Sequence, residues 1–340
     1  MISATDQDRA LGMDYYITDS PGCSGVIRSS PHDFLVDEVF EELSYEGGRY
    51  LVLEMEKTDW DTHHLIRELS RKLRISQKRF GWAGTKDKRA VTVQRISIMN
   101  LDEAELKRIT LPGLKIKVLG RTNRSVSLGD LLGNRFRITI RDLACPEPGA
   151  TLARITEEIV QQKGVPNYFG AQRFGHDGGN VEQGRAMLAR EIRVRHPKKK
   201  GIYLSAVRSF VFNEVLALRV QQGLWGKTLP GDVLDEAGRP TGPLWGRGRV
   251  ISTDQAQALE NGVAERHATL CDGMEHAGLD QERRALVASP VDMSWEWPQG
   301  NQLVLTFSLP AGNYATSLVN EILLATEPDR HAENGSSAGE

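Results

Sequence analysis

Hydrophobic and polar residues alternate in several short stretches of the chain, which is the pattern of β-strands with one buried face. In RYLVLEME, the side chains of Leu51, Leu53 and Met55 fall on one side. In RFRITIR, at residues 135–141, one side is apolar and the other carries three arginines and a threonine. This second stretch predicts a sheet with one face on a core and the other toward an anion. We expect further strands at residues 24–28, 34–39, 91–98, 114–119 and 295–309. Within residues 91–98 the apolar positions change parity, which indicates either a β-bulge or two buried faces.

Apolar residues spaced by four positions predict helices elsewhere. Between residues 59 and 75, Leu65, Leu69 and Leu73 form such a stripe, and Asp61 or Thr62 can cap the helix. A second stripe is basic and is either free to meet phosphates or simply solvated: Arg67, Arg71 and Arg74. Further helices are expected at residues 101–109, 150–162, 181–191, 205–223, 253–271 and 280–288, and one ending at 324. The densest basic run, residues 190–200, contains a proline, so we expect a loop or arm there.

The composition is that of a soluble globular protein, because 39% of the 340 residues are hydrophobic and 26% are charged. The chain has no run of 18 apolar residues, and its first residues lack the features of a signal peptide. We therefore expect no membrane span. The cysteines, Cys23, Cys145 and Cys271, form no C-x-x-C pair, which suggests reduced thiols in a cytoplasmic protein.

The formal net charge is −2, which argues against a uniformly basic RNA-coating protein but not against a basic patch. Such a cluster exists between residues 67 and 95, where ten basic residues are opposed only by Glu68 and Asp87. Cysteines and histidines form no cluster, and His63-His64 lacks H-E-x-x-H spacing, so we expect no metal site. The stretch GWAGTKD does not match the nucleotide-binding loop pattern.

The most informative stretch is FGWAGTKDKRAVTVQRISI, at residues 80–98, where a single acid stands among cations. Gly81 and Gly84 suit a tight backbone path just before Asp87. Neighbouring cations favour an ionised carboxylate, which is a poor general acid but a usable nucleophile or base. The plain alternative is a solvated charged turn. The cations are Lys86, Lys88 and Arg89.

GTKDKRAVTVQ resembles the G-x-K-D-x-x-A-x-T-x-Q signature of the TruD family of pseudouridine synthases, in which this aspartate is catalytic. Four further elements resemble the family in the same order, so that the resemblance runs from about residue 26 to 324. They are an early P-x-D-F-x-V-x-E pattern preceded by Arg28, the G-N-x-F element at residues 133–136, GVPNYFGAQRFG at residues 164–175, and P-A-G-x-[FY]-A-T at residues 310–316. The family often has a lysine at the position of Arg28, so the charge is kept while its geometry changes to a planar fork.

The resemblance implies roles for particular side chains. Asp87 would be catalytic, and Phe136 would stack a base that has left the helix. Asn134 would orient Asp87 or read a base edge. Asn167 and Arg173 lie in an aromatic, glycine-punctuated loop that suits single-stranded RNA. Four cations would keep Asp87 ionised or bind phosphates: Arg28, Lys86, Lys88 and Arg89. The alternatives are a surface arginine at 28, a core aromatic at 136, a turn residue at 134 and a packed interdomain loop at 164–175.

The implied fold is α+β, with a mixed, largely antiparallel sheet and flanking helices. A discontinuous catalytic domain, residues 1–163 and 290–327, would be interrupted by an inserted TRUD domain, residues 164–289, and followed by a disordered tail, residues 328–340. The implied reaction is isomerisation of uridine to pseudouridine in tRNA, usually at uridine 13 of the D arm. The stacked target base would have to flip out. We expect a cytoplasmic monomer with no cofactor, because the reaction is redox-neutral.

The residues leave the mechanism open. Asp87 could attack the base or the sugar, or remove a proton at C2′ to give a glycal. One competing function is a non-catalytic RNA-binding or RNA-folding protein that uses the same cleft. A weaker one is an RNA-directed hydrolase, which would release free uracil or cleaved strands.

Overall fold

The computed structural model describes residues 2–18, 23–41, 43–175, 178–298 and 300–328. The chain forms two compact units, each built from three separate segments. We call residues 24–145, 290–312 and 325–340 the sheet unit, and residues 1–23, 146–289 and 313–324 the helical unit. The domain limits expected from the sequence stay a prediction, and the expected disordered tail lies outside the described residues from position 329 onward.

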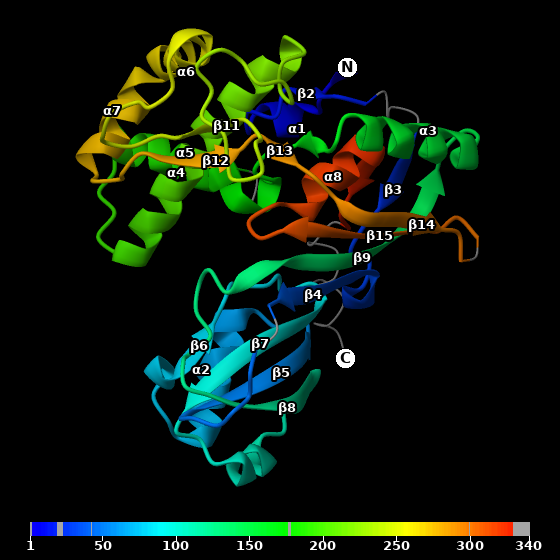
Figure 1. Cartoon of the computed structure of the whole chain (residues 1–340), viewed down its shortest axis with the longest axis vertical. Helices are drawn as coiled ribbons and strands as arrows, with labels where there is room; N and C mark the ends of the chain where they lie inside the picture. The colour runs from blue at the N-terminus through cyan, green and yellow to red at the C-terminus, as the bar shows by residue number, and fades with distance from the viewer. Residues whose placement is uncertain (1, 19–22, 42, 176–177, 299, 329–340) are drawn as a thin grey trace, which may run out of the picture. The chain divides into compact units, whose positions relative to one another are not determined.

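The sheet unit is built on one large sheet (Figure 1). The pairings along its path are antiparallel, except that β4 and β7 run parallel, which confirms the predicted mixed, largely antiparallel α+β fold. Three short strands join this path: β6 pairs with β7, β3 pairs with β9, and β16 pairs with β3. The strands in spatial order are β14 (Val291–Glu296), β15 (Leu303–Pro310), β9 (Leu131–Ala144), β4 (Phe34–Phe40), β7 (Val91–Met99), β5 (Tyr50–Thr58) and β8 (Leu114–Thr122). The three short strands are β3 (Ser24–Val26), β6 (Phe80–Trp82) and β16 (Leu324–Thr326).

One helix of the sheet unit, α2 (Thr62–Leu73), packs beside β5, β6 and β7 (Figure 1). Asp61 caps it by accepting a hydrogen bond from the backbone N–H of His64 at 3.0 Å. The predicted stripe of leucines is buried, and each such side chain contributes about 1.5–3 kcal/mol relative to its exposed form. The predicted helix is therefore confirmed, with ends a few residues inside the predicted ones. Short 3₁₀ helices of this unit precede β4, β6 and β8; they are Pro31–Asp33, Gln77–Arg79 and Glu103–Arg108.

The parity change in β7 reflects two buried faces and not a bulge. The β5–β7 ladder runs from Tyr50 opposite Met99 to Thr58 opposite Val91 without a register shift. Ile96 and Ile98 face the core that contains α2, while Ser97 between them hydrogen-bonds Ser125 on the other side.

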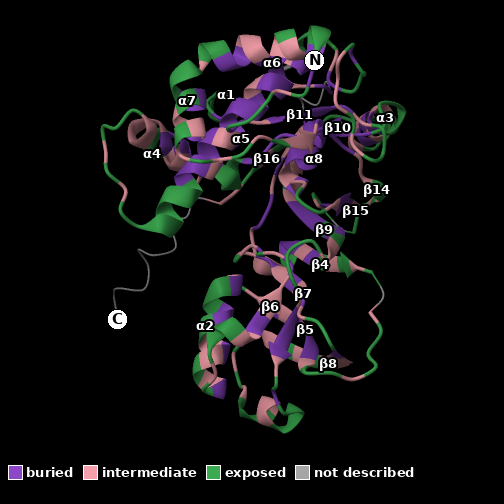
Figure 2. Ribbon diagram, turned by 60° about the vertical axis from the view of Figure 1, so that its left-hand side comes forward, coloured by how far each residue is buried: buried purple, intermediate pink, exposed green. Residues whose placement is uncertain are grey.

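The helical unit is organised around α5 (Pro197–Gln221), most of which is buried (Figure 2). By length and composition alone α5 could cross a membrane, but 67% of its most apolar window is buried inside the protein, as in a core helix. The other helices are α1 (Asp6–Arg9), α3 (Pro148–Gln161), α4 (Gly179–Leu188), α6 (Asp254–Arg266), α7 (Ala268–His276) and α8 (Ala315–Ile322). Short antiparallel pairs join β1 (Ile2–Ser3) to β2 (Tyr15–Tyr16), β10 (Val165–Pro166) to β13 (Val287–Ala288), and β11 (Thr241–Leu244) to β12 (Glu282–Ala285).

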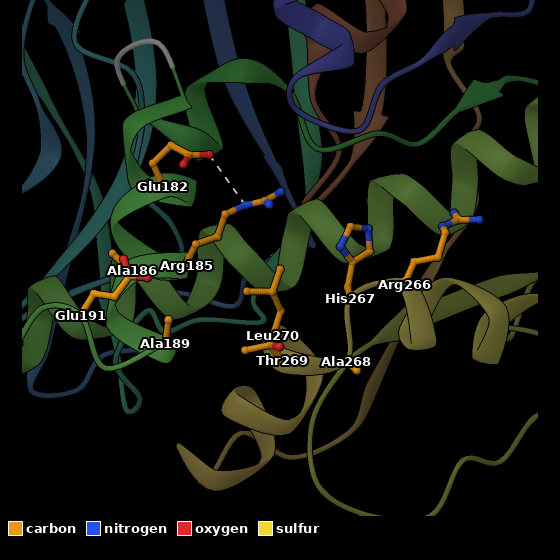
Figure 3. Close-up of a pocket in the computed structure, with 10 residues that line it drawn as sticks. All are labelled: Glu182, Arg185, Ala186, Ala189, Glu191, Arg266, His267, Ala268, Thr269 and Leu270. Atoms are coloured by element: carbon orange, nitrogen blue, oxygen red, sulfur yellow. Dashed lines mark ion pairs between the residues drawn. The ribbon is translucent and has the colours of Figure 1, made fainter.

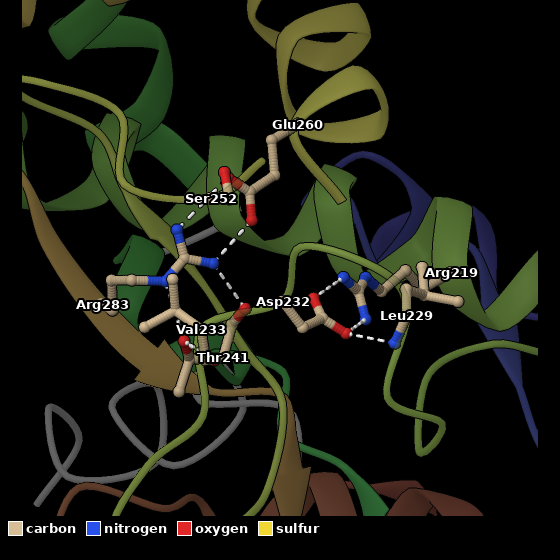
Figure 4. A network of polar contacts seen from close by, with 8 residues as sticks. All are labelled: Arg219, Leu229, Asp232, Val233, Thr241, Ser252, Glu260 and Arg283. Atoms are coloured by element: carbon tan, nitrogen blue, oxygen red, sulfur yellow. Dashed lines mark hydrogen bonds and ion pairs between the residues drawn. The ribbon is translucent and has the colours of Figure 1, made fainter. Parts of the chain in front are cut away.

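Buried ion pairs tie the segments around α5 together (Figure 4). Arg219 on α5 pairs with Asp232, and neither side chain is exposed to solvent. Arg283 on β12 pairs with Glu260 on α6 at 2.6 Å and also donates to the Thr241 carbonyl. Removing one partner of such a pair leaves a buried charge, which typically costs about 3–5 kcal/mol.

Three expectations for local structure were wrong. Residues 280–288 form β12 and β13 and not a helix. The basic run forms the expected loop only over residues 190–196. Its last residues, 198–200, are the first turn of α5, because Pro197 stands at the first helical position, where proline has no intrahelical hydrogen bond to lose. Cys23 and Cys145 are disulfide-bonded, while Cys271 is free and buried. Sequence spacing does not reveal this, because the two cysteines are far apart along the chain. The cytoplasmic location stays a prediction.

Candidate active site

Asp87 lies in the loop that joins β6 to β7, within the sheet unit. Its Oδ2 accepts a hydrogen bond from Nη2 of Arg28 at 2.7 Å. The side chain of Asp87 is 25% exposed, whereas that of Arg28 is only 8% exposed. The loop therefore presents a carboxylate to solvent and backs it with a buried cation.

Arg28 is held in place by several contacts. Its backbone is left-handed, with φ of 56°, just after β3. Its guanidinium carbon lies 4.1 Å from the centre of the Phe34 ring, and its Nη1 pairs with Glu327. A planar guanidinium can bridge two carboxylates and stack on a ring at once, which a lysine ammonium cannot. Arg28 thus orients Asp87 from a fixed position.

Lys86 points into the sheet unit. Its Nζ pairs with Oε1 of Glu38 at 2.7 Å, and both side chains are buried. Oε2 of Glu38 accepts from the backbone N–H of Arg95 at 2.9 Å. Burial raises the pKa of Glu38, and the charge of Lys86 opposes that shift. Of the other predicted cations, Lys88 is exposed and Arg89 is partly exposed, so Lys88 is the more accessible to a phosphate.

A third buried cation lies near Asp87. Lys57 on β5 is 1% exposed, and its Nζ donates to the carbonyl of Trp60 at 2.5 Å. Burial lowers the pKa of Lys57 to about 8, while the negative charges of Asp61 and Asp87 oppose that shift.

Three phenylalanines continue the site along the sheet. Phe136 on β9 stacks on Phe307 at a centroid distance of 5.4 Å and meets the edge of Phe34 at 6.2 Å. Phe136 is only 6% exposed, so in this structure it packs as a core aromatic. Its role in stacking a base stays a prediction that requires the ring to become accessible.

Asn134 lies on the same strand face as Phe136, because residues two apart on a strand share a face. Glu38 on β4 stands opposite it in the ladder. The Oδ1 of Asn134 is buried and accepts no hydrogen bond from the described residues. A buried acceptor without a partner is uncommon, and at a substrate site it is available to a ligand donor.

Comparisons with known proteins show the family to which this chain belongs. The family model for tRNA pseudouridine synthase D (TruD) matches residues 10–196. A tRNA pseudouridine synthase D from Aeromonas salmonicida is 34% identical over 351 residues, which cover 95% of this chain and 97% of the relative. This chain belongs to the TruD family of tRNA pseudouridine synthases. A Methanosarcina mazei protein assigned to the same family is 50% identical over 170 residues, covering 49% of this chain and 39% of the relative.

The fold agrees with that of a TruD family structure. A crystal structure of a Methanosarcina mazei protein assigned as tRNA pseudouridine synthase D superposes with a TM-score of 0.72 at 28% sequence identity. The match covers 95% of this chain and 98% of that chain. The family resemblance drawn from the motifs is thereby confirmed.

Two predicted substrate-binding residues lie in the helical unit, where they form part of a packed cluster. Asn167 is 2% exposed; its Oδ1 accepts from Arg284 at 2.6 Å and its Nδ2 donates to the Ala285 carbonyl. Arg173 donates to Ser209 at 3.2 Å and lies over the ring of Phe169. These contacts agree with the packed-loop alternative, and RNA contact by this loop stays a prediction.

The helical unit also contains a pocket of about 350 Å³ between α4 and the junction of α6 with α7 (Figure 3). Arg185 and Glu182 form an ion pair at 3.7 Å on one wall. His267 lies on the opposite wall, and its Nε2 is hydrogen-bonded to Oε2 of Glu214 at 3.2 Å. None of the residues predicted for the active site lines this pocket. Among the described residues, no group of three or more metal-ligating side chains occurs either.

Sequence reasoning missed several residues that contact the predicted ones. Phe34 and Glu38 belong to the early family pattern, so the sequence contained a signal for them. Their contacts with Arg28 and Lys86 depend on the fold and could not be predicted from that pattern. Glu327 carries no local signal, because its role depends on the pairing of β16 beside β3.

Proposed function

We propose that this chain uses Asp87 to convert uridine 13 in the D arm of tRNA to pseudouridine. The observation that carries the proposal is the partly exposed carboxylate of Asp87 paired at 2.7 Å with a buried arginine. Membership of the TruD family supplies the reaction, and the resemblance of the motif around Asp87 supplies its role.

The reaction balances without a cofactor. The bond from N1 of uracil to C1′ breaks, the base turns, and a bond from C5 to C1′ forms. The proton that leaves C5 is balanced by the proton that N1 gains, and nothing is oxidised or reduced. Each route left open for Asp87, attack on the base, attack on the sugar or proton removal at C2′, requires an ionised and accessible carboxylate.

Access to a stacked uridine requires that the nucleotide leave the helix, at a cost of about a few kcal/mol. The unpartnered Oδ1 of Asn134 supports recognition of the flipped base, because a uracil N–H could donate to it. The exposure of Lys88, on the same loop as Asp87, supports a phosphate contact by this residue.

The target position is tested with two tRNA transcripts that differ only at position 13, one with uridine and one with cytidine. Each is incubated with the protein, and pseudouridines are mapped by carbodiimide modification and primer extension. We expect a stop at position 13 in the first transcript and none in the second. Pseudouridine elsewhere in both transcripts would overturn the choice of uridine 13 but keep the reaction. If incubation with the protein adds no pseudouridine to total RNA from cells that lack it, the RNA-binding alternative is favoured.

A further inference from the structure

Two buried polar side chains stand behind the catalytic loop without taking part in the chemistry proposed above. Thr62 is the first residue of α2, and Gln94 lies in the middle of β7. Both are 0% exposed. Burying a hydroxyl and an amide is unfavourable unless each finds hydrogen-bond partners, so the partners indicate what these residues do.

Their partners are the backbone of the loop just before Asp87. The N–H of Lys86 donates to Oγ1 of Thr62 at 3.0 Å. The hydroxyl of Thr62 donates in turn to Oε1 of Gln94 at 3.2 Å. Nε2 of Gln94 then donates to the carbonyl of Gly84 at 2.6 Å. The chain of hydrogen bonds leaves the loop at residue 86 and returns to it at residue 84.

This chain of hydrogen bonds depends on the hydroxyl of Thr62 and the amide of Gln94. The group at residue 62 must accept from a backbone N–H and donate onward, which a hydroxyl does. The group at residue 94 must accept and donate through different atoms, which an amide does. Valine is similar in shape to threonine, and methionine to glutamine, but neither replacement provides the hydrogen-bond donor and acceptor that this chain of hydrogen bonds needs.

Both residues are anchored on rigid elements. Thr62 follows the cap residue Asp61, and its helix is packed on the core through Leu65. Gln94 is opposite Met55 in the continuous β5–β7 ladder. Lys57 holds the turn before the helix through the carbonyl of Trp60. The loop is thus tied to a helix and a strand that cannot shift independently of the core.

We propose that Thr62 and Gln94 are positioning residues, which fix the backbone of residues 84–86 so that the carboxylate of Asp87 meets Arg28 and the substrate in the productive orientation. The inference rests on the proposed function, because it assigns these residues to the action of Asp87. Neither residue contacts the substrate in this account, and neither changes the affinity for tRNA.

The test compares Thr62→Val and Thr62→Ser with the unaltered protein in single-turnover pseudouridine formation. Misplacing a reacting group by about 1 Å costs on the order of 10²-fold in rate, so we expect Thr62→Val to lower the rate by about 10- to 100-fold. The Kd for tRNA should stay within about twofold, because no binding contact is lost. Thr62→Ser, which keeps the hydroxyl, should restore most of the rate.

The matched control is Thr122→Val. Thr122 on β8 is also buried, and its hydroxyl donates to the carbonyl of Arg124 at 2.8 Å, so the same substitution removes a comparable hydrogen bond away from the loop. It should lower stability about as much as Thr62→Val, by about 1 kcal/mol, and leave the single-turnover rate unchanged.

Gln94→Met provides a second route. If the two residues act as one unit, Gln94→Met and the double variant with Thr62→Val should lower the rate about as much as Thr62→Val alone. Hydrogen exchange of the peptide that spans residues 83–90 should accelerate in each variant that folds, because the Lys86 N–H loses its acceptor.

The outcomes separate this inference from the proposed function. Full activity of Thr62→Val or Gln94→Met, while Asp87→Ala is inactive, overturns the positioning role and leaves Asp87 catalytic. A rise in the Kd for tRNA that accounts for the whole loss overturns it as well, and so does an equal loss in Thr122→Val. Full activity of Asp87→Ala overturns the proposed role of Asp87 and this inference with it.

Discussion

Arg28 contacts two carboxylates and an aromatic ring at the same time. It pairs with Asp87 and Glu327, and its guanidinium lies over Phe34. The family pattern often has a lysine at this position, so the arginine is a feature of this chain that the local surroundings accommodate. An arginine that bridges two carboxylates and stacks on a ring is not interchangeable with a lysine.

We therefore expect Arg28→Lys to lower the single-turnover rate by about tenfold, because one ammonium cannot keep both ion pairs and the stacking contact. Arg28→Met should lower it by on the order of 10²-fold or more, because the carboxylate of Asp87 loses its charged partner. The rate at which pseudouridine forms in tRNA, with enzyme in excess over tRNA, measures both. Equal activity of all three proteins would show that Arg28 does not orient Asp87.

Glu321 on α8 is a buried acid in the helical unit. It is 1% exposed, and its Oε2 accepts from the backbone N–H groups of Ile17 and Thr18 at 3.0 and 3.2 Å. Burial raises the pKa of Glu321 from 4.5 to about 7, against the effect of these hydrogen bonds.

This shift predicts a pH-dependent stability. Between about pH 4.5 and pH 7 the folded state keeps a proton that the unfolded state has lost, so the free energy of unfolding falls as the pH rises through that window. Glu321→Gln removes this titration. Its stability relative to the unaltered protein should rise by up to about 3 kcal/mol between pH 4.5 and pH 7 and then stay constant. Urea unfolding at both pH values measures the difference; a difference independent of pH would contradict the buried neutral acid.

At the scale of elements, the two glycines before Asp87 have different reasons to be there. A Cβ at Gly81 on β6 would overlap the side chain of Ser125 and the carbonyl of Val126. A Cβ at Gly84 would meet only ordinary contacts at 3.8 Å, and the φ of Gly84 is not in the left-handed region. The close approach of the loop between β8 and β9 requires Gly81, whereas neither space nor backbone conformation requires Gly84.

Gly81→Ala should therefore lower the free energy of unfolding by about 1–3 kcal/mol, the usual cost of overpacking. Gly84→Ala should leave it within about 0.5 kcal/mol. Chemical denaturation of the two variants side by side tests this. A larger loss in Gly84→Ala than in Gly81→Ala would mean that the loop is more tightly constrained than its contacts indicate.

Alternation and four-residue spacing predicted the elements that present a single apolar face. β9 and α2 appear close to their predicted positions because packing on one side determines each pattern. The prediction for residues 280–288 failed because β12 is short and rich in charged residues and β13 has only two residues. Both strands pair with segments from distant parts of the chain. The same reason explains the disulfide at Cys23 and Cys145.

The candidate site was predictable only as far as its motifs reach. Asp87, Arg28, Phe136 and Asn134 stand in patterns that resemble the TruD family, and the structure places them in one unit. That Lys86 faces Glu38, that Lys57 is buried near Asp87, and that Phe136 is covered by its neighbours depend on tertiary contacts between strands. No local spacing encodes those contacts.

At the scale of the whole molecule, the net charge of −2 means that affinity for a polyanion must come from patches. One lies on α2 and the residue after it, where Arg67 and Arg74 are exposed, whereas Arg71 pairs with Glu68. Another is the exposed lysine run 198–200 at the start of α5.

If the helix α2 tracks the tRNA backbone, removing its charges should reduce the salt dependence of binding. Each lost phosphate contact lowers the slope of log Kd against log salt by about 0.7–0.9. We expect the double variant Arg67→Gln, Arg74→Asn to reduce the slope by nearly two such steps, with asparagine chosen because residue 74 has a left-handed backbone. Arg108→Gln, in the exposed 3₁₀ helix before β8, is the matched control. An equal change of slope in both would mean that the effect reflects net charge and not a contact by α2.

The central claim is that Asp87 performs the isomerisation, and the most direct test is mass spectrometry of digested tRNA after incubation with the unaltered protein and with Asp87→Ala. The tRNA should come from cells that lack this protein, and both proteins should have matching circular dichroism and tRNA affinity. We predict pseudouridine from the unaltered protein and none above background from the variant. Pseudouridine formed at similar rates by both would contradict the assignment of Asp87 and move the catalytic group elsewhere in the chain.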